Sequence, residues 1–148
     1  MASMDLTQAE ADYLFALEKV RRSDDPQQFP DIGTDLELAL VSRDGREDFI
    51  LNVARGRIKI TKCSYQNRAR SVAVLARLDI DGPPHQNPDG TYVPCPHIHL
   101  FREGYADKWA FPAADDVGPI SKDVQTVYQQ FCRFCSIIEP PVLQGGLF

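Results

Sequence analysis

Apolar side chains alternate with polar ones through much of residues 35–80, and only short turns interrupt the pattern. A period of two residues is typical of strands that bury one face. We therefore expect four strands in this stretch, over residues 36–41, 49–53, 57–61 and 71–80. Asp44-Gly45 favours a tight hairpin between the first two strands. Short connections between successive strands predict an antiparallel meander.

Helices are expected on both sides of this stretch. Thr7-Gln8-Ala9-Glu10 is a capping box, in which the hydroxyl and the carboxylate bond free N–H groups at a helix start. Apolar residues at helical spacing extend the first predicted helix over residues 8–21. A second helix is predicted before Pro140-Pro141 from the spacing of Val124, Val127, Tyr128, Phe131, Cys135 and Ile138.

The remaining segments predict a fifth strand and two loops. Residues 81–96 hold five of the eleven prolines, so this segment is predicted to be a stiff, irregular loop. Residues 97–101 return to a strand pattern, and residues 103–120 are predicted to form an ordered loop. The predicted fold class is α+β, with an antiparallel meander sheet of about five strands and an N-terminal and a C-terminal helix on one face.

The length of 148 residues favours a single domain. Within it, residues 1–5 are expected to be a tag or disordered, residues 6–140 globular and residues 141–148 a tail. No apolar run reaches the roughly 18 residues that a membrane helix needs, and the N-terminal region lacks the layout of a secretory signal. We expect a cytoplasmic protein that does not bind a membrane.

The charge pattern bears on the kind of partner. A net charge of −5 argues against a protein that binds bulk nucleic acid through overall charge. Residues 54–77 nevertheless hold seven basic residues and no acidic one. Such a band can receive phosphate or an acidic partner. It is equally compatible with a solvated sheet face whose charges block edge pairing.

The four cysteines are expected to be reduced thiols, because nothing in the sequence indicates export. They are Cys63, Cys95, Cys132 and Cys135. Cys132 and Cys135 form a CxxC pattern, but they fall within the second predicted helix, where such a pair is often only packing. The spacing to Cys95 and the histidines matches no common zinc module. We predict no metal and no cofactor, and leave open whether Cys95, Cys132 and Cys135 bind zinc.

The feature that most directly suggests chemistry is the segment His97-Ile98-His99-Leu100. Alternate residues of a strand face the same side, so Ile98 and Leu100 should enter the core while His97 and His99 share the opposite face. Two neighbouring imidazoles can serve as acid and base around a phosphodiester bond. The alternative is that both are structural histidines with satisfied hydrogen bonds.

Further residues could complete such a site. Tyr105 is an alternative acid, and four cations are candidates for holding phosphate. Arg68 and Arg70 are placed in the turn between the third and fourth strands, whereas Arg102 and Lys108 follow the fifth strand. In this hypothesis His97 or His99 is the base, and the other histidine or Tyr105 is the acid.

Three stretches of the sequence resemble a family of uncharacterised bacterial and phage proteins, a domain of unknown function. They are KCSYQNRAR (62–70), LDIDGPPHQNPDG (78–90) and CPHIHLFREGYADKWAFP (95–112). The resemblance covers most of residues 6–112 and implies a prokaryotic or phage protein, without an activity. The layout of a helix before an antiparallel meander is also similar to that of RelE- and barnase-like ribonuclease toxins, which is an analogy at the level of the fold.

These observations favour a metal-independent ribonuclease or RNA-binding protein of a toxin or defence context. The first alternative is a non-enzymatic interaction protein, such as a phage inhibitor of host defence (an anti-CRISPR) or an antitoxin-like partner. It would use the acids of residues 5–48, Asp24, Asp25 and Asp31 among them, or the basic band. The second alternative is a binder of a small nucleotide signal. Homodimer formation is left open.

Overall fold

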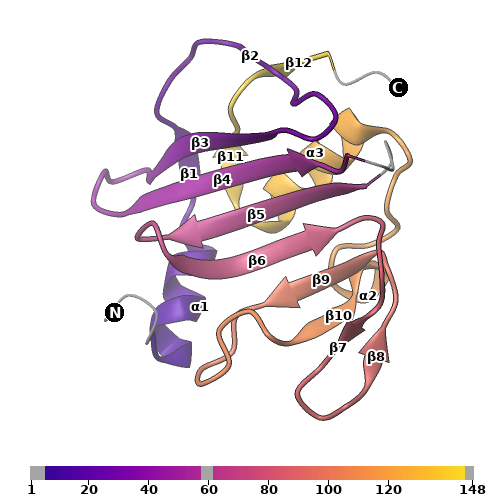
Figure 1. Cartoon of the computed structure of the whole chain (residues 1–148). Coiled ribbons are helices and arrows are strands. Elements are labelled where there is room, and N and C mark those ends of the chain that lie inside the picture. The colour runs from indigo at the N-terminus through magenta and orange to yellow at the C-terminus, as the bar shows by residue number, and fades with distance from the viewer. Residues whose placement is uncertain (1–5, 58–61, 146–148) are drawn as a thin grey trace.

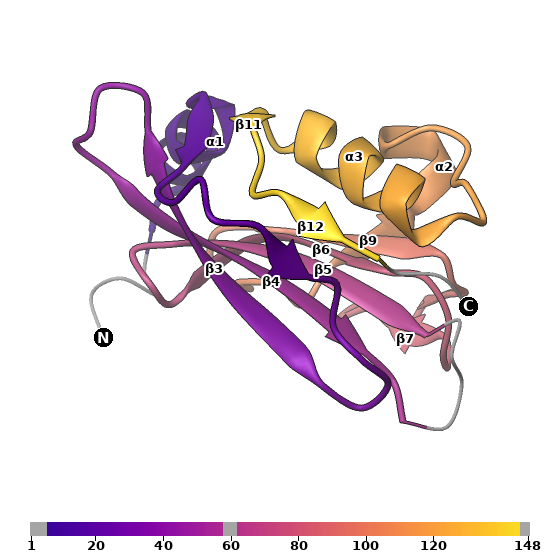
Figure 2. The ribbon, with the colours of Figure 1, turned by 90° about the horizontal axis from the view of Figure 1, so that it is seen from above.

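A single sheet of eight strands dominates the computed structural model, which describes residues 6–57 and 62–145. The strand order is β10-β9-β6-β5-β4-β3-β1-β11, and the helices cover one face of the sheet (Figures 1 and 2). The helices are α1 (Gln8–Ala16), α2 (Ala113–Asp116) and α3 (Val124–Phe134). The sheet is built from β1 (Lys19–Arg21), β3 (Asp35–Ser42), β4 (Asp48–Arg55), β5 (Cys63–Ala69), β6 (Ala73–Asp79), β9 (His97–Leu100), β10 (Ala110–Pro112) and β11 (Ile137–Glu139). Two small pairs join β2 (Gln27–Gln28) with β12 (Leu143–Gln144), and β7 (His85–Gln86) with β8 (Tyr92–Val93).

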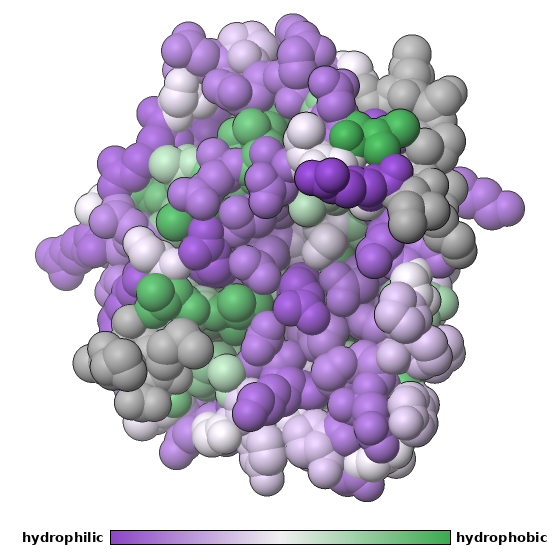
Figure 3. Space-filling view, in the orientation of Figure 1, coloured by the Kyte–Doolittle hydropathy of each residue, from purple (hydrophilic) through white to green (hydrophobic). Residues whose placement is uncertain are grey.

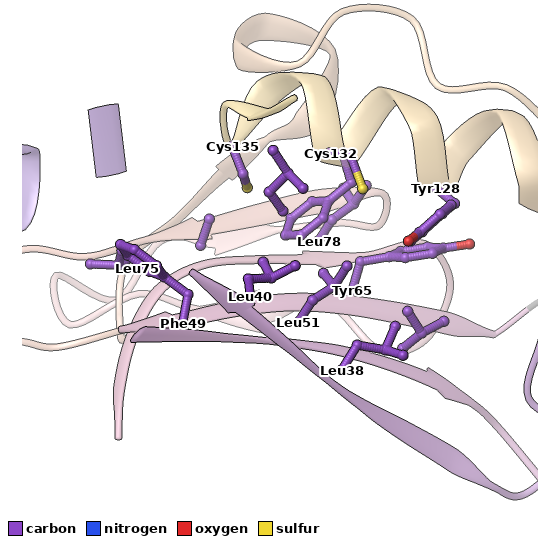
Figure 4. Packing of buried hydrophobic residues seen from close by; sticks show 14 of the residues in the cluster. Leu38, Leu40, Phe49, Leu51, Tyr65, Leu75, Leu78, Tyr128, Cys132 and Cys135 are labelled. Carbon is purple, nitrogen blue, oxygen red and sulfur yellow. The ribbon is translucent and has the colours of Figure 1, made fainter. Parts of the chain in front are cut away.

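The hydrophobic core lies between the sheet and the helices. Every second residue of the central strands is buried there, as the alternation predicts. Helix α3 turns an apolar stripe toward the strands, so that Tyr128 and Phe131 both pack near Tyr65 of β5 (Figure 4). Burying such large side chains provides most of the driving force for folding.

The predicted antiparallel meander is confirmed for β3 to β6, but the prediction of a sheet of about five strands is wrong. The sheet is mixed, because β1 pairs antiparallel with β3 and parallel with β11. At the other edge, β9 and β10 extend it. Strand β10 and helix α2 both lie in residues 103–120, where a loop was expected.

The first predicted helix begins as expected, since both hydrogen bonds of the Thr7–Glu10 capping box form. It ends at Ala16 rather than residue 21, and Lys19 begins a strand instead. The Lys19 ammonium is fully buried and donates to three main-chain carbonyls, those of Phe15, Leu17 and Cys135, at 2.8–2.9 Å. It therefore joins the end of α1 to the end of α3, an arrangement that a continued helix would prevent.

The third strand differs most from the prediction. The predicted strand at residues 57–61 falls largely on residues 58–61, which lie outside the described residues. The strand that follows β4 is β5, whose residues include Tyr65 and Arg68, which were expected in a turn. Its core-facing positions include a polar residue, Asn67, which is fully buried. A polar residue on the inner face interrupts the alternation of apolar and polar residues by which a strand is recognised in a sequence.

The second predicted helix is also shorter than expected. Helix α3 ends at Phe134, and Ser136 has a left-handed φ of 59° that turns the chain. Ile137 then pairs with Lys19 as part of β11, so Ile138 belongs to a strand and not to the helix. Beyond Pro141, Leu143 is buried and pairs with Gln27.

Among the described residues, the second face of the sheet carries no helix, and it is mainly hydrophilic (Figures 2 and 3). The segment between β6 and β9 includes the β7–β8 hairpin and crosses part of this face. Within residues 6–57 and 62–145, none of the helices has the length and apolar character needed to cross a membrane.

The buried ammonium gives a test of how the sheet edge is held. Replacing Lys19 by Met should leave three buried carbonyls without a donor and lower the free energy of unfolding by about 3 kcal/mol. Urea denaturation followed by circular dichroism measures the change. The control is Lys108→Met at an exposed lysine, expected to change stability by less than about 0.5 kcal/mol. A Lys19→Met protein as stable as the wild type would contradict this role.

Candidate functional site

Antiparallel pairing of β6 with β9 brings four polar residues together on the open face of the sheet. Asp79 lies opposite His97, and Arg77 lies opposite His99. The intervening Ile98 is fully buried in the core, as expected for the opposite parity. The sequence-based placement of both histidines on one face is therefore correct.

The proline-containing segment before β9 adds the third histidine. His85 of β7 packs edge-on against His99, with ring centroids 4.5 Å apart, and the rings of His97 and His99 are 5.0 Å apart. All three histidines of the chain thus form one cluster. His97 and His99 are only 2% and 0% exposed, so they do not project outward as the hypothesis required. They form the floor of a cavity instead.

This cavity, called the histidine cavity below, has a volume of about 530 Å³. That size lies in the range of small-ligand sites. Its wall contains the cations Arg55, Lys62 and Arg77 and the carboxylates Asp79 and Asp81. The polar and basic lining is suited to an anion more than to an apolar molecule.

Hydrogen bonds to main-chain carbonyls show, for each of the three histidines, a ring nitrogen that carries a proton. His97 Nδ1 lies 3.0 Å from the Val93 carbonyl oxygen, and His99 Nδ1 lies 2.8 Å from that of Asp107. A carbonyl only accepts, so both Nδ1 atoms donate. His85 has the reverse arrangement, because its Nε2 lies 2.7 Å from the Lys108 carbonyl.

Asp79 is the carboxylate of the cluster. Its Oδ2 lies 3.1 Å from His97 Nε2 and 3.3 Å from His99 Nε2. Burial alone would raise the pKa of Asp79, but its contacts with the two histidines and the charge of Arg77 outweigh burial and hold that pKa well below its usual range. Asp79 is therefore ionised at neutral pH.

Arg77 borders the same group of atoms. Its Nη2 donates to His99 Nε2 at 3.0 Å, and its Nη1 pairs with Asp107 at 3.1 Å. Its Nε lies 3.4 Å from the second oxygen of Asp79. The guanidinium thus places a positive charge at the wall of the cavity.

Tyr105 and Arg102 lie outside the histidine cavity. Arg102 stacks over Trp109 at 4.5 Å, and Tyr105 meets the same ring edge-on at 5.9 Å. Neither lines the cavity, and Lys108 takes part through its carbonyl, which bonds His85. Tyr105 and Lys108 instead line a different pocket, together with Leu6, Thr7 and Glu103.

The two cations of the basic band that were predicted to hold phosphate, Arg68 and Arg70, do not line the histidine cavity. Arg68 pairs with Glu37 and donates to Asn52, and Arg70 pairs with Glu47. Acids of the expected interaction surface are paired in the same way, in Glu18–Arg43, Asp24–Arg21 and Asp48–Arg22. These ion pairs thus reduce both the acidic and the basic excess of charge.

The cysteines lie on both sides of the sheet. Cys95 lines the histidine cavity, with its Sγ 3.6 Å from His97 Nδ1. Cys132 and Cys135 lie in the core between α3 and the sheet (Figure 4). Because the sheet separates them from Cys95, these three thiols do not converge on one ion. All four cysteines are free.

Three residues of the cluster, Arg77, Asp79 and His85, were absent from the predicted site. Asp79 had a usable signal, because Arg77 and Asp79 alternate with Leu78 and therefore share the face opposite the core. His85 had none, because the path of a proline-rich loop over a sheet depends on tertiary contacts.

Comparison with known proteins gives one match. The family model described as "Family of unknown function (DUF6978)" matches residues 6–137. No curated protein and no solved structure matches the chain. The expected resemblance to an uncharacterised family is thus confirmed, and the analogy to ribonuclease toxins is not.

The placement of the thiols can be tested by alkylation. Cys95 should react with iodoacetamide in the native protein, because its side chain is partly exposed, although burial raises the pKa of its thiol and slows the reaction. Cys132 and Cys135 should not react, because both are buried, and burial raises the pKa of the Cys132 thiol to about 12. Peptide mass spectrometry after a short pulse at pH 8 measures each site, with labelling in urea as the control. Labelling of Cys132 at the rate of Cys95 would contradict the buried placement.

Proposed function

We propose that this chain, which belongs to a family of unknown function (DUF6978), cleaves a phosphodiester bond of RNA or of a small nucleotide in the histidine cavity. The observation that carries the proposal is the convergence of all three histidines with Asp79 and Arg77 in one cavity. Acid–base groups and fixed cations in one place are what phosphodiester cleavage needs.

The arrangement supports a division of roles. His85 is the most accessible of the three rings, and its Nδ1 holds a lone pair because Nε2 donates to Lys108. It is the candidate general base. Arg77 and Lys62 line the cavity at positions where they can hold phosphate oxygens. Compared with the sequence-based hypothesis, His85 replaces His97 or His99 as the base, and Arg77 and Lys62 replace Arg68 and Arg102 as the cations that hold phosphate.

Binding of a small nucleotide without cleavage is the second candidate. It is favoured by the near-complete burial of His97 and His99, which restricts access to their rings. The same cavity and the same cations would hold the ligand. This function would appear as a ligand-dependent rise in melting temperature without product formation.

The test uses His85→Ala and, as a matched control, Gln86→Ala on the same strand. The substrates are a single-stranded RNA oligonucleotide and a set of cyclic and linear dinucleotides, each incubated with and without EDTA. We expect cleavage by the wild type and a loss of about 100-fold in rate for His85→Ala. The Gln86→Ala protein should keep the wild-type rate, since Gln86 is exposed and does not line the cavity.

Product formation is followed by gel electrophoresis for RNA and by chromatography for dinucleotides, so the two substrate sources are distinguished. Circular dichroism confirms that each variant is folded. No cleavage of any substrate under either condition would rule out the enzyme. A rise in melting temperature in that case would leave nucleotide binding as the function.

A further inference from the structure

The floor of the histidine cavity presents three electron-pair donors to one point. We propose that Asp79, His97 and His99 bind a divalent transition-metal ion, of the class that includes Zn²⁺, Co²⁺ and Fe²⁺. The donors are Asp79 Oδ2, His97 Nε2 and His99 Nε2, and all three atoms lie within 4.8 Å of one another. This metal site goes beyond the proposed function and stands on its own observations.

The hydrogen bonds of His99 are the first argument. His99 Nδ1 donates to the Asp107 carbonyl, and its Nε2 accepts from the cationic Arg77. The same Nε2 atom lies 3.3 Å from Asp79 Oδ2. This nitrogen thus already offers its lone pair to a positive charge, as a metal ligand does.

The distances are the second argument. An ion held tetrahedrally at about 2.0–2.1 Å from each ligand atom requires ligand atoms about 3.3 Å apart. Asp79 Oδ2 lies 3.1 Å from His97 Nε2 and 3.3 Å from His99 Nε2. Both distances from the carboxylate are thus close to that spacing, and the two imidazole nitrogens lie within 4.8 Å of each other.

The surroundings of the ligands are the third argument. Histidines that bind metals almost always donate the other ring N–H to a carbonyl or a carboxylate. His97 and His99 both do so, to the carbonyls of Val93 and Asp107. These bonds fix the ring orientations and direct both Nε2 atoms to Asp79. Two imidazoles and one carboxylate are suited to Zn²⁺ or Fe²⁺, whereas Mg²⁺ and Ca²⁺ prefer oxygen ligands.

Arg77 competes with the ion for the site. Its Nη2 lies 3.0 Å from His99 Nε2, so a bound ion displaces this hydrogen bond. Asp107 can keep the guanidinium at the wall, because Nη1 of Arg77 lies 3.1 Å from Asp107 Oδ2. A positive charge beside the site weakens the binding of a cation. Removal of that charge should therefore tighten metal binding.

Metal binding changes the interpretation of the cavity chemistry. With an ion in place, His97 and His99 are ligands and do not act as acid and base, which leaves His85 for proton transfer. Metal-assisted hydrolysis then replaces the metal-independent cleavage expected from the sequence. The ion would stand at the floor of the cavity, whose wall includes Lys62 and Arg77.

Isothermal titration of the full chain with ZnCl₂, and visible absorption after addition of CoCl₂, test the proposal without any substrate. We expect one ion per chain and the absorption bands of a Co²⁺ ion with nitrogen ligands. Asp79→Asn and His99→Ala should each weaken Zn²⁺ binding by at least about 100-fold, the upper end of the loss seen when an outer-shell partner is removed. Arg77→Gln should tighten it about tenfold.

The matched control is Asp81→Asn, which removes the same charge from the same cavity and should leave Zn²⁺ binding within about threefold of the wild type. Long-range ¹H–¹⁵N spectra of the wild type provide a measurement that needs no variant. On addition of Zn²⁺, the Nε2 signals of two histidines should shift while their Nδ1 atoms stay protonated.

Absence of stoichiometric Zn²⁺ and Co²⁺ binding by the wild type would overturn the metal site. Equal Zn²⁺ binding by the wild type and Asp79→Asn would do the same, and weaker binding by Arg77→Gln would contradict the position given to the ion. The result can be distinguished from a test of the proposed function. Metal binding without any cleavage would contradict only the proposed phosphodiester cleavage. Full cleavage in EDTA by a chain that binds no ion would contradict only the proposed metal site.

Discussion

The antiparallel register of β6 and β9 is the constraint on which the rest of the site depends. It places Asp79 opposite His97 and Arg77 opposite His99, and it directs the residues between them into the core. A shift by one residue would move the histidines to the apolar side, where their ring nitrogens would lack partners. The buried Ile98 therefore helps to determine the chemistry of the opposite face.

On both faces of the sheet, buried polar side chains donate hydrogen bonds to main-chain carbonyls. His97 and His99 each donate to a carbonyl on the open face, and Lys19 donates to three carbonyls on the helix side. A buried polar group without a partner would destabilise the fold. These hydrogen bonds thus hold side chains and loops in place relative to each other. The segment that covers the cavity also helps to determine which histidine ring nitrogens inside it carry a proton.

The sequence predicted those features that follow from local periodicity. These include the start of α1, the β3–β4 hairpin and the common face of His97 and His99, because caps, turns and alternation are local signals. The sheet edges and the position of His85 could not be predicted in this way. Strand β1 pairs with β11 across more than a hundred residues, and the proline-containing loop is placed by contacts with β9 and Lys108. Such long-range pairings leave no periodic signal in the sequence.

The parallel contact of β1 with β11 has a consequence for the order in which the molecule assembles. The meander of β3 to β6 closes short loops and can form early, whereas β1 acquires its second neighbour only when residues from beyond α3 return to it. Closing so long a loop slows folding. Until then the charge of Lys19 lacks its third acceptor, the carbonyl of Cys135. During synthesis this edge of the sheet would therefore stay open until residue 139 has left the ribosome.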